Sequence, residues 1–124
     1  MQTNAYNVYK NNSINHSSKE QLLLMLTDGA VKFVKIGRQA ILDKDIEKCN
    51  NVLQRTQDIF LELMVSLDQK GGDWAVQLYK VYQFINDKLA EANMKKDIEI
   101  LDEIIPLIED IRDTWHEAYK ISKR

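Results

Sequence analysis

The segment from Leu22 to Val34 most restricts how this chain folds, because it carries more apolar side chains than one helical face needs. At about 100° per residue, its apolar positions and those that continue them form two neighbouring stripes. The first contains Leu23, Leu26, Ala30, Val34, Gly37 and Ile41, and the second contains Leu22, Met25, Gly29, Phe33 and Ile36. One stripe is enough to face the core of a small bundle. We therefore expect the second stripe to lie at the margin of the core, where a partner or another part of the chain covers it.

Helical spacing continues along the rest of the chain and predicts helices over about 18–42, 45–69, 73–94 and 97–121. The second has the most regular seam: Ile46, Cys49, Leu53, Thr56, Phe60, Leu63 and Leu67. The inward side of the third is Trp74, Leu78, Val81, Ile85, Leu89 and Ala92, widened by Tyr79, Tyr82 and Phe84. The fourth carries Ile98, Leu101, Ile105, Ile108, Ile111 and Trp115. The aromatic residues among these are expected in the core or at its edge.

The expected helix boundaries coincide with capping and turn residues. Ser17 and Glu20 have the spacing of a capping box, which places the start of the first helix near residue 18. An aspartate of the polar turn 43–45 can cap the second helix. Gly71-Gly72 favours a left-handed residue that ends this helix, and Asp73 is the expected cap of the third.

The predicted fold class is all-α, an antiparallel up-down four-helix bundle, because four long helices joined by short turns favour antiparallel neighbours. Pro106 lies inside the fourth helix and predicts a kink or local break over 102–106. No repeat between the two halves supports a solenoid. The N-terminal segment 1–16 is expected to be a loosely docked, mobile arm unless Tyr6, Val8 and Tyr9 anchor it.

Composition excludes several functional classes. The 124 residues suit a single domain, and the formal net charge of -2 gives no general attraction to nucleic acid. The single cysteine, Cys49, cannot form an internal disulfide and suits a reducing compartment. The N-terminus lacks the pattern of a signal peptide, and no apolar run approaches the ~20 residues of a membrane helix. We expect a soluble cytoplasmic protein that neither binds nucleic acid nor inserts into a membrane.

The sequence also offers little for catalysis. Glu109, Asp113 and His116 lie on one helical face, but a di-iron bundle requires two carboxylate-x-x-His pairs and only one is present. Cys49 is expected to be a buried apolar filler, and Gly71-Gly72 lacks the spacing and lysine of a P-loop. We therefore predict no enzyme activity, no metal and no cofactor. The basic edge of the first helix, Lys32, Lys35 and Arg38, is either a solvated flank or a contact for an acidic or amide-rich partner.

Several short motifs, taken in order, resemble the flagellar secretion chaperone family, FliS. They are Asn4-Ala5-Tyr6-x-x-Tyr9, Leu24-Met25-Leu26-Thr27-Asp28-Gly29-Ala30, Leu63-x-x-Ser66-Leu67-Asp68, Ala90-x-Ala92-Asn93 with Asp97, and Trp115. Two positions depart from the family pattern, since Thr27 stands where a tyrosine is usual and Ser18 where a proline is usual.

This resemblance implies a cytoplasmic chaperone that binds the disordered C-terminal segment of flagellin, prevents its premature polymerisation and delivers it to the flagellar type III export apparatus. The hypothesis for the docking surface is the second stripe together with a neighbouring basic residue: Leu22, Met25, Gly29, Lys32, Phe33 and Ile36. Gly29 is expected to let a partner helix approach closely, and Tyr6, Val8 and Tyr9 form a gating arm that flagellin displaces. The alternative is a self-associating helical-bundle scaffold or adaptor, and a weak homodimer is left open.

Overall fold

The computed structural model describes residues 19–123, apart from the side chain of Gln69. It contains the helices α2 (Lys19–Leu42), α3 (Ile46–Ser66), α4 (Asp73–Lys95) and α5 (Ile98–Ser122), and a short 3-10 helix η1 (Gln69–Gly71). The described range contains no strand. The predicted all-α four-helix fold is confirmed. None of these helices is both long enough and apolar enough to cross a membrane.

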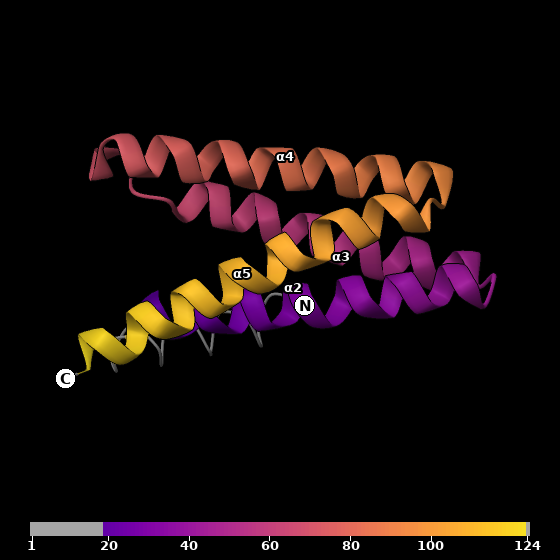
Figure 1. Ribbon diagram of the computed structural model, residues 1–124, viewed down its shortest axis with the longest axis horizontal. Coiled ribbons are helices and arrows are strands. Elements are labelled where there is room, and N and C mark those ends of the chain that lie inside the picture. Colours follow the sequence, from indigo (N-terminus) through magenta and orange to yellow (C-terminus); the bar gives the residue numbers. More distant parts are fainter. Residues whose placement is uncertain (1–18, 124) are drawn as a thin grey trace, which may run out of the picture.

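The helices pack as a ring in which α2 contacts α3 and α5, while α4 contacts α3 and α5 (Figure 1). Successive helices run antiparallel, as expected from their short connections. The pair α4 and α5 is not parallel along its length: the two lie close where α4 ends and α5 begins, and they separate toward the other end of the bundle (Figure 1). There the last turns of α5 lie beside the start of α2, where Gln21 donates a hydrogen bond to the Tyr119 hydroxyl at 3.3 Å.

The core follows the seam predicted for α3 most closely. All of its members are buried except Ile46, which is 60% exposed at the first turn of the helix. On α2 the buried residues are Thr27, Ala30, Val31, Val34, Gly37 and Ala40. On α5 the buried stripe is rotated from the predicted one, because Ile100 and Ile104 are buried and Ile98 and Ile105 are only partly so.

Of the two glycines of α2, Gly37 has the closer contact with α3. A Cβ atom on Gly37 would lie 2.5 Å from Leu53 Cδ2 and 2.9 Å from Leu53 Cγ. Leu53 is fully buried, so the absence of a side chain on Gly37 makes room for a core leucine.

Two predicted caps have different outcomes. The Asp45 carboxylate accepts a hydrogen bond from the Lys48 backbone N–H at 3.1 Å, so its capping role is confirmed. Asp73 is not the cap of α4, because Gly72 occupies that position and no side chain caps this helix. Gly72 has φ 80° and ψ -149°, a backbone conformation that glycine adopts readily and other residues rarely do. It does not end α3, because that helix already ends at Ser66. The reversal therefore lies before α4 and not directly at the end of α3.

The turns α2–α3 and α4–α5, at the same end of the bundle, share the sequence Lys-Asp-Ile-Glu, at 44–47 and 96–99. Lys44 and Lys96 both adopt positive φ, 58° and 52°. The next residue donates its backbone N–H to the carbonyl five residues earlier in both turns, from Asp45 to Ala40 at 2.9 Å and from Asp97 to Ala92 at 3.0 Å. The two helical hairpins thus close in the same way, a local repeat that the sequence analysis missed.

Pro106 does not interrupt α5, which continues from Ile98 to Ser122, so the expected local break is wrong. Pro106 and Asp102 are both exposed. Water can therefore bind the Asp102 carbonyl oxygen, which has no helical N–H donor at Pro106.

Candidate functional site

The second stripe of α2 lies at the margin of the core, beside α3. Met25 is 44% exposed, while Leu22, Phe33 and Ile36 are half-buried. Lys32 is exposed next to them. The stripe is therefore neither part of the closed core nor fully solvated, and its outer surface is available for contact.

Gly29 lies next to α3 of the same chain. A Cβ atom at this position would lie 3.3 Å from Ile59 Cδ1 of α3 and 3.9 Å from Phe33 Cε2. Ile59 therefore occupies the space beside Gly29 within the bundle.

Two cationic side chains from different helices lie over the Phe33 ring. Lys32 Nζ is 5.9 Å from the centre of the ring, and Arg55 of α3 has its guanidinium carbon at 5.4 Å. Contacts of this length are favourable cation–π contacts. Within residues 19–123 neither cation forms an ion pair with a carboxylate, so the centre of the stripe is an apolar strip with a positive border.

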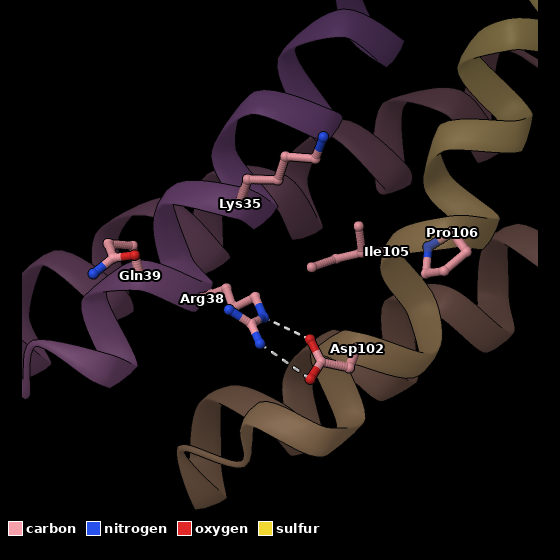
Figure 2. Close-up of a pocket in the computed structure, with 6 residues that line it drawn as sticks. All are labelled: Lys35, Arg38, Gln39, Asp102, Ile105 and Pro106. Carbon is pink, nitrogen blue, oxygen red and sulfur yellow. Dashed lines mark hydrogen bonds and ion pairs between the residues drawn. The ribbon is translucent and has the colours of Figure 1, made fainter.

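Lys35 and Arg38, the rest of the basic edge of α2, form surface ion pairs with α5. Lys35 pairs with Glu109 at 2.8 Å, and Arg38 makes two contacts with the Asp102 carboxylate, at 2.5 and 3.3 Å (Figure 2). The hydrogen bond from Arg38 lowers the pKa of Asp102 below its ordinary value. Lys35, Arg38 and Asp102 line a surface hollow together with Gln39, Ile105 and Pro106 (Figure 2). Lys35 and Arg38 therefore connect α2 to α5.

The metal-like spacing on α5 does not form a metal site. His116 Nε2 lies 2.7 Å from the Asp28 carboxylate of α2, whereas Asp113 pairs with Arg112 at 3.0 Å and Glu109 with Lys35. Residues 19–123 contain no group of three or more side chains arranged to hold a metal ion. The three α5 side chains each have a different partner.

Cys49 is fully buried, as expected for an apolar filler. Its thiol lies 3.8 Å from Asn93 Oδ1. Burial raises the pKa of this thiol, and the charge of Lys96 lowers it by less. The thiol is therefore protonated and shielded, which is unsuitable for a nucleophile.

The largest difference from the sequence analysis is on α4. Trp74 is 55% exposed, Phe84 47%, Val81 39% and Tyr79 37%, although all four were expected in the core or at its edge. Tyr82 is buried and accepts a hydrogen bond from Trp115 Nε1 at 3.0 Å. Apolar residues of α4 occupy more of its circumference than its neighbours cover. The sequence of α4, like that of α2, carries more apolar side chains than one buried face needs.

The expected gating arm of Tyr6, Val8 and Tyr9 lies outside the described residues, as does Ser17, the expected cap of the first helix. Within residues 19–123, apolar side chains are exposed both on the second stripe of α2 and on α4.

Comparison with known proteins identifies the family. A family model described as "Flagellar protein FliS" matches residues 2–122. The "Flagellar secretion chaperone FliS" of Bacillus subtilis (strain 168) is 31% identical over 121 residues, which cover 98% of this chain and 90% of that protein. The protein of the same name from Campylobacter jejuni subsp. jejuni serotype O:6 is 33% identical, covering 96% and 94%. That of Salmonella typhimurium (strain LT2) is 29% identical, covering 82% and 76%. On the match over residues 2–122 and these identities, the chain belongs to the FliS family of flagellar proteins.

Proposed function

We propose that this chain is a cytoplasmic export chaperone that binds the disordered C-terminal segment of flagellin, prevents its premature polymerisation and delivers it to the flagellar type III export apparatus. Membership of the FliS family supports this function, because the similar proteins from Bacillus subtilis and Campylobacter jejuni are named flagellar secretion chaperones. Such a protein works by binding, and we expect neither catalysis nor a cofactor.

The observation that carries the proposal is the partly exposed stripe of α2. A disordered segment loses conformational entropy when it folds on a partner, and burial of apolar area offsets that loss. An amphipathic helix achieves this by laying its apolar face on a receiving strip. The stripe with Met25 at 44% exposure supplies such a strip.

The proposed contact residues are those expected from the sequence. Met25 and Phe33 make the apolar contacts, and Lys32 borders them. Gly29 has no side chain that projects from the strip, and its close neighbour within the bundle is Ile59. Its proposed role is therefore to leave room for the partner above the strip. Leu22 and Ile36 extend the strip at its two ends.

Replacement of Met25 by glutamate tests the surface. A carboxylate placed in an apolar contact without a partner loses hydration, so we expect flagellin affinity to fall about tenfold or more. Isothermal titration calorimetry with full-length flagellin, and with flagellin lacking its C-terminal segment, measures this. Val65→Glu is the matched control, because Val65 is 80% exposed on α3 and lies outside the stripe. Circular dichroism confirms that each variant is folded.

Three results would count against the proposal. The first is that flagellin without its C-terminal segment binds as well as full-length flagellin. The second is that Met25→Glu binds flagellin as well as Val65→Glu does. A stable dimer in light scattering that buries the stripe and excludes flagellin would instead favour the scaffold alternative.

A further inference from the structure

The helices α4 and α5 separate toward the end of the bundle where α4 begins (Figure 1). The two helices are still in contact where Trp115 donates a hydrogen bond to Tyr82. Beyond this point α5 packs beside α2, where Gln21 donates a hydrogen bond to Tyr119. Leu23, Leu78 and Trp115 pack against the core here but are only partly buried. Within residues 19–123 the core is therefore incompletely covered along this side of the bundle. We call the surface formed by α4 and by α5 from Glu103 to Ile121 the α4–α5 face.

The α5 side of this face has the spacing that a helical partner requires. Leu107, Ile111, Thr114, Ala118 and Ile121 alternate in steps of four and three, so they form one stripe. Ile111 is 8% exposed and reaches the core, whereas Leu107 is 37% exposed and Ile121 is 59% exposed.

The α4 side contributes a tryptophan that is held in place. Trp74 is 55% exposed, yet a Cβ atom on Gly71 would lie 2.9 Å from its ring. The ring therefore packs on the 3-10 turn before α4 while its remaining surface is open. Val81, two turns further along, is 39% exposed on the same side. Aromatic surface that is already ordered loses little entropy on binding.

An acidic row borders the α5 stripe. Glu103, Asp110 and Glu117 are seven residues apart and exposed, and they extend over about 21 Å of helix at 1.5 Å per residue. None of the three forms a hydrogen bond or ion pair with another residue of 19–123. On the α4 side, the cation Lys88 already pairs with Glu91 at 3.4 Å.

The other acidic flank of α5 behaves differently. Asp102 and Glu109 are also seven residues apart, but they pair with Arg38 and Lys35 of α2. Helical geometry places Glu103 and Asp110 on the flank away from α2, because they follow these residues by about 100°. Ion pairs thus neutralise the charges between α2 and α5, whereas those beside the α4–α5 face have no counterion among residues 19–123.

We propose that the α4–α5 face docks a basic amphipathic helix of a partner protein, independently of the flagellin surface on α2. The apolar stripe of this helix covers Leu107, Val81 and Trp74. Its lysine or arginine side chains, repeated every seventh residue, lie opposite Glu103, Asp110 and Glu117. The exposed charges contribute mainly to specificity and to the association rate, so binding weakens as salt rises.

Tryptophan fluorescence offers a direct assay, because Trp74 and Trp115, the two tryptophans of the chain, both lie at this face. The probe is a synthetic helix of about three heptads with leucine at the apolar positions and lysine beside them. It contains no tryptophan. We expect it to change the emission and to bind at least about tenfold more tightly than the same helix with glutamate in place of lysine.

The triple variant Glu103→Lys, Asp110→Lys, Glu117→Lys is expected to lower affinity for the basic probe about tenfold or more and to remove most of its salt dependence. The control variant Glu47→Lys, Asp58→Lys, Asp87→Lys has the same change in net charge at exposed residues without ion pairs within 19–123, and we expect it to bind with little loss. Met25→Glu is expected to bind the probe normally, which separates this surface from that of the proposed function.

The proposal is overturned if the acidic and basic probes bind equally, or if the two triple variants lose affinity to the same extent while circular dichroism shows both folded. Sedimentation at increasing protein concentration tests the other occupant. A dimer that forms in the wild type and disappears in the Glu103, Asp110 and Glu117 variant would assign the face to a second copy and also overturn it.

Discussion

Replacement of Gly37 by alanine tests how closely α2 and α3 are packed. The new Cβ would lie 2.5 Å from Leu53 Cδ2 and 3.3 Å from Val52 Cγ2, and Leu53 is fully buried. Overpacking of this kind typically costs about 1–3 kcal/mol, because the buried side chain must leave its rotamer or the helices must move apart. Alanine also favours the helix over glycine by about 1 kcal/mol, which offsets part of the loss.

Gly29→Ala is the matched control in the same helix. Its Cβ would lie 3.3 Å from Ile59 Cδ1, the end of a half-buried side chain that can move outward. The helix-propensity gain is nearly the same at both positions, so it cancels when the two variants are compared. We expect Gly37→Ala to be less stable than Gly29→Ala by about 1–3 kcal/mol.

Urea denaturation followed by circular dichroism measures this difference, provided that the slope of the transition is unchanged. At about 4 °C per kcal/mol, thermal unfolding should show the same order. Equal stability of the two alanine variants would refute the reasoning, because it would mean that α2 and α3 have room for a methyl group at Gly37.

Three further outcomes follow from single contacts. Tyr82→Phe removes the acceptor of Trp115 Nε1 and should destabilise the protein by about 1–2 kcal/mol in urea, whereas an unchanged midpoint would show that this bond adds nothing. Arg38 lowers the pKa of Asp102 in the folded state. The stability that this pair contributes is therefore present above the ordinary carboxyl pKa of 3.8 and is lost as the pH falls below it. Asp102→Asn lacks this contribution, so between about pH 5 and about pH 3 it should lose less stability than the wild type. Burial raises the pKa of the Cys49 thiol, so labelling by a thiol reagent at mildly alkaline pH should be slow until urea unfolds the protein, and labelling at the rate of a free peptide thiol would contradict the buried position.

The seam of α3 was predictable because its apolar residues occupy a single narrow stripe. With only one apolar face available, Leu53, Phe60 and Leu63 have to face the core. The capping role of Asp45 was predictable for a related reason, since a cap depends on residues within one turn of itself.

The apolar surplus on α2 and α4 could be recognised in the sequence but not assigned to a direction. On α4, Trp74 and Phe84 fit the periodicity of an inward side and are nevertheless exposed. Periodicity shows which sides of a helix are apolar, and it does not show how many of those sides a neighbour covers. Because α5 separates from α4 and packs on α2, part of α4 has no helical neighbour within the described residues (Figure 1).

The sequence by itself determined that the chain forms four long helices, where most of them begin and end, and which stripe of α3 is buried. These properties depend on residues within a few turns of each other. Only the tertiary structure decided that Lys35 and Arg38 pair with α5, that His116 joins Asp28, and that Gly29 faces Ile59. Such contacts join residues far apart in the chain, and the angle at which whole helices cross determines them.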